Sequence, residues 1–103
     1  MESWVAKIVE IIVRNYDPDE ICLFGSMSKN QSNMESDIDL LIIKDTDIPR
    51  RFRGSSFKEQ LSRFPIKIDL LFYTHAELES AKKKKYSFID AISRKTKIVY
   101  KKF

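Results

Sequence analysis

The sequence predicts an α/β protein, of the α+β type, in which about four strands form a sheet flanked by helices. Helical and extended apolar patterns alternate along the chain, separated by turn residues, and no internal repeat is present. Hydrophobic residues make up 43% of the chain, with only two Gly and three Pro, which excludes disordered and collagen-like classes. A length of 103 residues suits one domain, so we expect residues 1–103 to form a single folding unit.

The first half of the chain predicts one helix and two strands. Apolar residues recur at helical spacing over residues 3–16, and Asp17-Pro18 ends that pattern. The apolar run at residues 20–24 is too short for a helix and is closed by Gly25, so it predicts a buried strand. A polar stretch with room for one or two helical turns follows, and a second strand is expected over residues 37–44.

Two capping boxes predict helix starts in the second half. After a basic, irregular connection at residues 45–54, residues 56–59 match the capping-box pattern and begin a helix that Pro65 ends. A third strand is expected at residues 66–73, and a second capping box at residues 74–77 begins another helix. The last two predicted elements are a short helix near residues 86–93 and a strand at residues 97–101.

Two acidic residues lie on one face of the second predicted strand. Side chains in a strand alternate with a period of two, so Asp37 and Asp39 share a face with Leu41. Burying two carboxylates together is costly unless a positive charge lies between them, and Mg²⁺ prefers such oxygen ligands. Asp69 lies on the more polar face of the third strand and would join them if the two strands are neighbours. For the Asp-x-Asp pair alone, an exposed sheet end with Asp37 capping a turn is an equally good interpretation.

The turn after the first strand is a candidate phosphate site. Gly25-Ser26 follows a buried strand and precedes a segment that could begin a helix, whose unpaired N–H groups attract anions. Gly25 lets the main chain approach an anion closely, and Ser26 can donate its hydroxyl. For an isolated Gly-Ser, a plain turn with a serine N-cap is the more common structure. Neither a Walker A pattern nor G-x-G-x-x-G is present, which argues against P-loop and Rossmann sites.

One Cys and one His cannot form a disulfide framework or a usual zinc site, so carboxylates are the metal ligands that remain. Cys22 lies in an apolar stretch, where a small buried hydrophobic side chain is a better interpretation than a reactive thiolate. We assign no functional role to His75 or Trp4, because a position in a capped helix start explains His75 and packing in the core explains Trp4.

Charge is unevenly distributed along the sequence. Residues 1–69 hold 10 Lys/Arg and 12 Asp/Glu, whereas residues 70–103 hold 9 and 3. The lysine run at residues 82–85 could attract phosphate-bearing partners, although a solvated helix end is the favoured interpretation. No apolar run approaches the roughly 20 residues of a membrane span, and residues 1–10 do not resemble a secretory signal. We therefore expect a cytoplasmic protein with no membrane partner.

Three motifs occur in an order and at a spacing that resemble a known family. They are Leu23-Phe24-Gly25-Ser26, then Ser36-Asp37-Ile38-Asp39-Leu40, then Ile68-Asp69-Leu70-Leu71. Together they resemble the DNA polymerase beta nucleotidyltransferase superfamily, and in particular its minimal nucleotidyltransferase (MNT) group. The resemblance covers nearly the whole chain and implies the polymerase-beta-like fold, with a mixed sheet of about four strands.

The resemblance implies a Mg²⁺-dependent nucleotidyltransferase that moves a nucleoside monophosphate, AMP from ATP, to an acceptor hydroxyl. Asp37, Asp39 and Asp69 match the family's acids, so they are implied as catalytic residues and as ligands of a two-ion Mg²⁺ site. Asp69 is also implied as a general base, a role that metal-assisted deprotonation would make optional. The residues implied to bind the triphosphate of ATP or another NTP are Gly25, Ser26 and Lys29.

The resemblance also implies a partner, a helical HEPN-type toxin that this chain accompanies as antitoxin and modifies. The family often has a small residue, an Arg and a Gly where this chain has Ser28, Lys29 and Asn30, and Lys lacks the bidentate fork of Arg. One alternative is therefore an antitoxin that binds nucleotide or protein with weak or no catalysis. A second alternative is transfer to RNA, attracted by the basic tail and by the arginines at positions 50, 51 and 53. Nucleic acid is the less favoured partner, and a homodimer stays open.

Overall fold

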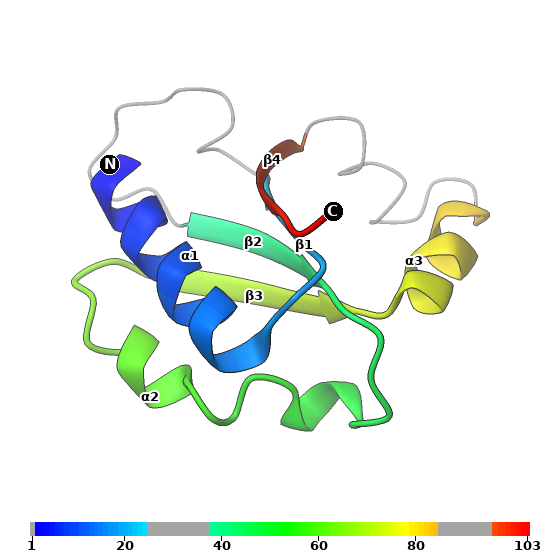
Figure 1. Ribbon diagram of the computed structural model, residues 1–103, viewed down its shortest axis with the longest axis horizontal. Coiled ribbons are helices and arrows are strands. Elements are labelled where there is room, and N and C mark those ends of the chain that lie inside the picture. The colour runs from blue at the N-terminus through cyan, green and yellow to red at the C-terminus, as the bar shows by residue number, and fades with distance from the viewer. Residues whose placement is uncertain (1, 25–37, 85–95) are drawn as a thin grey trace.

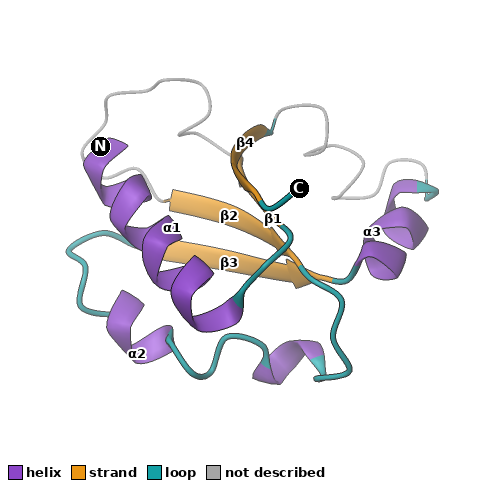
Figure 2. Cartoon of the chain, viewed as in Figure 1, coloured by secondary structure: helices purple, strands orange, loops and turns teal. Residues whose placement is uncertain are grey.

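The computed structural model describes residues 2–24, 38–84 and 96–103, which form a four-stranded sheet accompanied by helices (Figures 1 and 2). The strand order is β3-β2-β1-β4, with β2 and β3 parallel and the other neighbouring pairs antiparallel, so the predicted mixed sheet is confirmed. The elements are α1 (Glu2–Tyr16), β1 (Glu20–Phe24), β2 (Ile38–Ile43), the 3₁₀ helix η2 (Arg50–Phe52), α2 (Lys58–Leu61), β3 (Ile68–Tyr73), α3 (His75–Lys82) and β4 (Lys97–Lys101).

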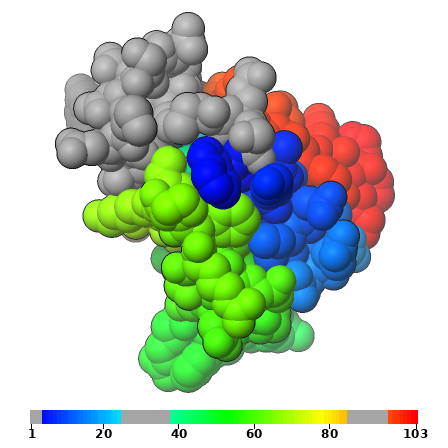
Figure 3. Space-filling view, turned by 90° about the vertical axis from the view of Figure 1, so that its left-hand side faces the viewer, coloured from blue at the N-terminus to red at the C-terminus, as the bar shows by residue number. Residues whose placement is uncertain are grey.

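The sheet separates two hydrophobic clusters. On one face Ile8 and Ile12 of α1 pack with Leu40 and Ile42 of β2, and all four are fully buried. On the opposite face the alternate residues of β2, beginning with Leu41, form a second cluster with α3. Figure 3 shows the surface of α1, in blue, between the green segment that follows β2 and the red C-terminal strand. The alternation of side chains predicted for β2 is therefore confirmed.

The two predicted capping boxes have different outcomes. The Glu77 N–H donates to the Thr74 hydroxyl (3.1 Å) and the Thr74 N–H donates to the Glu77 carboxylate (2.9 Å), so the second box is confirmed. The first box is wrong, because α2 begins at Lys58 after the N-cap residue Phe57 and has no side-chain cap. The N–H groups of Phe57 and Lys58 both donate to the Gly54 C=O, in a turn that buries the Phe57 ring in the core. Tertiary packing overrides the local signal here, and the helix ends earlier than predicted.

The other described elements lie close to their predicted positions. β1 and β4 have the predicted bounds, α1 begins one residue earlier than predicted, and β3 begins two residues later. The connection predicted as irregular contains the single turn η2. The helical turns predicted before residue 37 and the helix predicted at residues 86–93 lie outside the described residues. Among the helices that are described, none is long and apolar enough to cross a membrane.

Candidate active site

Asp39 and Asp69 stand side by side on neighbouring strands. The parallel register of β2 and β3 pairs the two residues directly, and neighbouring strands lie about 4.8 Å apart. Because paired residues point to the same face, both carboxylates lie on the face that carries Leu41 and Leu71, away from α1. Asp39 is half-buried and Asp69 is exposed. The condition for their convergence, that the second and third strands are neighbours, is met.

The end of β1 lies at the same place in the sheet. Phe24, the last residue of β1, pairs with Asp39 in the antiparallel register. Since Gly25 follows Phe24 in the sequence, the strand that leads to the candidate phosphate-binding turn ends beside this carboxylate. The predicted site residues that lie outside the described part of the chain are Gly25, Ser26, Lys29 and Asp37, and their roles stay predictions.

The paired carboxylates suit a magnesium ion. Mg²⁺ binds oxygen ligands and commonly takes one or two carboxylates, completing its coordination with phosphates and water. Within residues 2–24, 38–84 and 96–103 no three His, Cys, Asp or Glu side chains come together as a metal site, and Asp37 lies outside these ranges. The donor set that the structure does bring together, Asp39 with Asp69, has the oxygen chemistry that fits Mg²⁺.

Cys22 and His75 serve the fold. The buried Cys22 thiol donates a hydrogen bond to the Glu20 carboxylate, with Sγ 3.2 Å from Oε2. Burial, together with this carboxylate, raises the pKa of the thiol to about 12, so it stays protonated at neutral pH and is no nucleophile. His75 lies in the first turn of α3, as predicted, with Nε2 2.8 Å from the Asp19 carboxylate.

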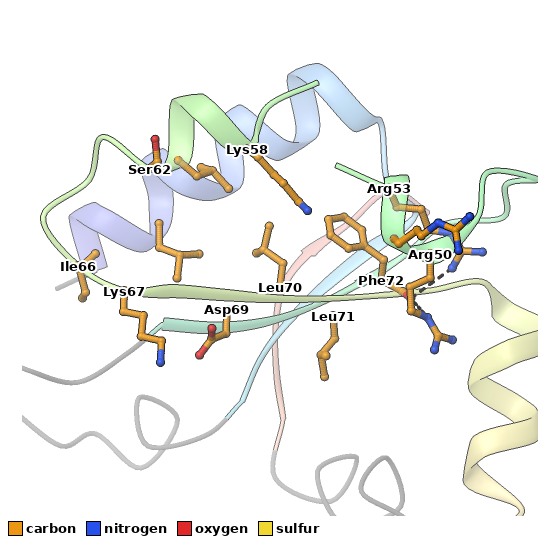
Figure 4. A pocket seen from close by; sticks show the side chains of 13 residues that line it. Arg50, Arg53, Lys58, Ser62, Ile66, Lys67, Asp69, Leu70, Leu71 and Phe72 are labelled. Atoms are coloured by element: carbon orange, nitrogen blue, oxygen red, sulfur yellow. Dashed lines mark hydrogen bonds between the residues drawn. The ribbon is translucent and has the colours of Figure 1, made fainter. Parts of the chain in front are cut away.

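A groove runs along the outer edge of β3, next to Asp69 (Figure 4). This β3 groove has a volume of about 580 Å³ and is bordered by β3 and by the segment from η2 to α2. Its described lining contains five basic side chains and one acidic side chain, which is Asp69. The lining residues are Arg50, Arg51, Arg53, Lys58, Leu61, Ser62 and residues 66–72. The candidate catalytic acid therefore borders an electropositive groove, which favours anionic ligands.

Arg53 is buried at one end of the β3 groove and has a carboxylate partner. Its Nη1 and Nη2 donate to the two carboxylate oxygens of Glu77, at 2.7 and 3.2 Å, which makes a bidentate ion pair. Its Nε donates to the Ile48 C=O (2.7 Å), and Nη1 also reaches the Phe72 C=O (3.3 Å). Arg50 donates through Nε to the same Phe72 carbonyl (3.0 Å) and lies 3.3 Å from the Glu77 carboxylate. These contacts hold both guanidinium groups against the end of β3.

The Arg53–Glu77 pair stays ionised at neutral pH. The hydrogen bond from Arg53 lowers the pKa of Glu77 to about 2, aided by the Thr74 N–H and by the charge of Arg50, although burial opposes the shift. The same hydrogen bond raises the pKa of Arg53. The sequence alone predicts only a capping role for Glu77, because its ion-pair partner lies 24 residues away in a loop predicted to be irregular. The one hint in the sequence of an ion pair here was the presence of three arginines, at positions 50, 51 and 53, in that short loop.

Both the sequence and the fold have counterparts among known proteins. The family model for "Polymerase beta, Nucleotidyltransferase" matches residues 6–102. Among solved structures, the fold is similar to a chain of the toxin-antitoxin MntA-HpeT mutant, with a TM-score of 0.63 and 19% identity, over 94% of this chain and 72% of that chain. No curated protein matches the sequence. At this identity the structural likeness concerns the fold, whereas the family model covers nearly the whole sequence.

Proposed function

Because the chain belongs to the polymerase beta nucleotidyltransferase family, we propose that it transfers AMP from ATP to a hydroxyl group of a partner protein in a Mg²⁺-dependent reaction. The observation that carries this proposal is the direct pairing of Asp39 with Asp69 beside the end of β1. Two carboxylates at one end of a sheet, next to a basic groove, can bind a cation that in turn binds the phosphates of a nucleotide. A carboxylate there can also accept a proton.

Asp37, Asp39 and Asp69 would hold the metal in this proposal. When bound, Mg²⁺ neutralises charge on the triphosphate and lowers the pKa of the acceptor hydroxyl. The half-buried Asp39 is held between β1 and β3 by the strand ladder, which suits a fixed ligand. The exposed Asp69 borders the β3 groove, so it can meet an acceptor hydroxyl there and take its proton.

The acceptor oxygen forms the new bond to the α-phosphorus of ATP while the bond from that phosphorus to the bridging oxygen breaks. The proton of the acceptor goes to Asp69, and pyrophosphate is the leaving group. In the proposal, the turn at Gly25-Ser26 donates main-chain N–H groups and a hydroxyl to the phosphates. Lys29 adds a positive charge beside them.

The proposed acceptor is a helical HEPN-type toxin, for which this chain acts as the antitoxin. The likeness of the fold to a chain from a toxin-antitoxin structure supports this assignment, as do the MNT-type motifs of the sequence. Attachment of AMP would add a bulky anionic group to the surface of the toxin that carries the hydroxyl. Such a group disrupts a neighbouring functional surface by charge and by size.

The test is to incubate the purified chain with labelled ATP and Mg²⁺, with and without the product of the neighbouring gene. We expect label on the partner and released pyrophosphate, and we expect both to disappear in the Asp39→Asn variant. The matched control is Asp47→Asn, which neutralises an exposed acid on the loop after β2, and it should keep full activity. An Asp39→Asn protein that transfers AMP at the wild-type rate would show that the proposal is wrong.

A binding-only antitoxin is the second candidate function. It is favoured by Lys29 and Asn30, which replace an Arg and a Gly often found in the family. A tight complex with the partner, without label transfer or pyrophosphate release, would support this candidate. Lys29→Arg, which restores the guanidinium fork, is then the variant to test for recovered transfer.

A further inference from the structure

Half of the main-chain groups of β3 face away from the sheet. In the described sheet β3 is an edge strand with β2 as its neighbour. The C=O groups of Lys67 and Tyr73 accept hydrogen bonds from the N–H groups of Ile38, at 2.9 Å, and of Lys44 just after β2, at 3.0 Å. The main-chain groups of the odd-numbered residues of β3 therefore turn toward β2. Because successive residues of a strand alternate, the polar main-chain groups of Ile68, Leu70 and Phe72 point outward.

Arginines close one end of this outer edge. The Phe72 C=O accepts hydrogen bonds from Arg50 Nε and Arg53 Nη1, at 3.0 and 3.3 Å. In the part of the chain that the structure describes, no hydrogen bond uses the outward groups of Ile68 or Leu70. Two donors and two acceptors are therefore available to another extended segment, and the pairing must stop before Phe72.

The β3 groove surrounds these available groups. Figure 4 shows Lys58 extending from α2 toward β3 on the side of Leu70, whereas Asp69 and Leu71 point to the opposite side. The groove thus has Lys58 on one side of the edge, whereas the candidate catalytic acid lies on the other side together with Lys67. A segment paired with β3 would send alternate side chains to these two sides.

The charge of the β3 groove favours an acidic occupant. Lys58 and Arg51 are exposed, and the contact described for the Arg51 guanidinium is the ring of Phe52, 4.9 Å away. Glu77 balances part of the charge of Arg50 and Arg53, but it lies outside the groove lining. With Asp69 as the one acid against five bases in the described lining, complementary charge on a partner is negative.

We propose that the acceptor protein enters the β3 groove as an extended acidic segment, which adds a strand to β3 and places a hydroxyl side chain beside Asp69. The inference rests on the proposed transfer reaction for the role of Asp69. Main-chain pairing with Ile68 and Leu70 supplies affinity and register, as in other cases of strand addition. Acidic side chains then face Lys58 while the alternate side chains face Asp69, so the modified hydroxyl lies one residue from an acidic side chain.

The first test measures binding of a fluorescein-labelled octapeptide of alternating Glu and Thr by fluorescence anisotropy. The measurement contains no ATP, so it succeeds or fails independently of nucleotide transfer. We expect the peptide to bind, and we expect a version methylated at its peptide nitrogens to bind about tenfold more weakly or worse, because it cannot donate to β3. A peptide with Lys in place of Glu should also bind about tenfold more weakly.

Protein variants then locate the binding site. Lys58→Glu should weaken binding of the Glu-Thr peptide about tenfold, because it reverses a charge on the groove wall. The matched control is Lys83→Glu, the same charge change at the exposed end of α3, which should bind the peptide as the wild type does. Asp69→Asn should keep peptide binding while losing AMP transfer, which separates this inference from the proposed function.

Several results would overturn the inference. Equal binding of the methylated and unmethylated peptides excludes strand addition, and unchanged binding to Lys58→Glu excludes the β3 groove. Failure of the Glu-Thr peptide to bind at about millimolar concentration overturns it as well. If oligo(U) binds in preference to the peptide and Lys58→Glu abolishes that binding, the groove is a nucleic-acid site instead.

Discussion

The two faces of the β2–β3 pair use neighbouring residues for different purposes. Toward α1, Ile38, Leu40 and Ile42 are fully buried and anchor the larger hydrophobic cluster. Toward the other face, Asp39 is half-buried and Asp69 is exposed at the groove. Adjacent residues of β2 therefore have different roles, because Leu40 stabilises the fold and Asp39 belongs to the candidate site. Substitution of Leu40 should therefore cost stability, whereas substitution of its neighbour Asp39 should cost activity.

The sharpest test of this division is Asp39→Asn. Asn has nearly the same shape as Asp, so we expect transfer of AMP to fall by about 10³-fold, equivalent to about 4 kcal/mol of transition-state stabilisation. The free energy of unfolding should change by less than about 1 kcal/mol, because Asp39 is half-buried and belongs to neither hydrophobic cluster. Labelled transfer and urea denaturation measure the two effects. A loss of stability comparable to the loss of activity would break the comparison.

Leu40→Ala changes the adjacent residue on the opposite face and should have the opposite outcome. Leu40 is fully buried, so its truncation should lower the free energy of unfolding by about 3 kcal/mol through lost burial and a cavity. Urea denaturation measures the change. At a temperature where the variant is still folded, the rate of AMP transfer per folded molecule should stay near that of the wild type. A full loss of transfer by folded protein would contradict the division between the faces.

Gly54→Ala tests how tightly the hydrophobic cluster on the α1 face of the sheet is packed. Gly54 has φ +87°, which favours glycine, and a Cβ there would lie 2.6 Å from the Phe72 Cζ atom. We expect a loss of about 2 kcal/mol of unfolding free energy, from backbone strain and from displacement of that ring. Thermal or urea denaturation gives the value. An unchanged free energy of unfolding would mean that the Phe72 ring can move at little cost. The cluster on the α1 face would then be less tightly packed than the burial of its residues indicates.

The smallest effect should come from the ion pair at the groove end, which lies outside both hydrophobic clusters. The pKa of Glu77 is about 2 in the folded protein, below the roughly 4.3 of an unfolded chain, so the ionised pair stabilises the fold above about pH 4.5. This stability, about 1 kcal/mol after solvent screening, should be lost as the pH falls from about 4.5 toward 2. Denaturation of Glu77→Gln should show a flatter pH dependence over that window. An unchanged slope would show that the pair adds nothing to stability.

Local patterns predicted most of the elements, and tertiary packing decided the exceptions. Thr74 and Glu77 form their predicted capping box because both members lie within one turn of the chain. Ser56 does not cap a helix, because burial of Phe57 governs that turn and no local pattern shows how deeply a side chain will be buried. Predictions of this kind hold where the interacting groups are close in sequence.

The candidate site shows the same dependence on sequence distance. The period of two places Asp39 on one face of its strand. Its pairing with Asp69, 30 residues later in the sequence, depends on which strands become neighbours in the sheet. The Arg53–Glu77 pair was beyond prediction for the same reason, since it joins a loop to a helix start 24 residues later in the sequence. The acids of the candidate site and the family were therefore readable from the sequence, whereas the groove beside Asp69 needed the fold.

Phe72 connects the hydrophobic core to the edge of the sheet. Its ring packs against Tyr16 and Phe57, with centroids 5.4 and 6.2 Å away, while its carbonyl accepts the hydrogen bonds from Arg50 and Arg53. The aromatic packing holds Phe72 in place, so its carbonyl stays bonded to the arginines and closed to strand pairing. An unprotected edge invites open-ended pairing between copies of a chain, the route to aggregation. Because this carbonyl is occupied, strand pairing along the β3 edge is limited to the short stretch before Phe72, which suits the proposed addition of one short segment.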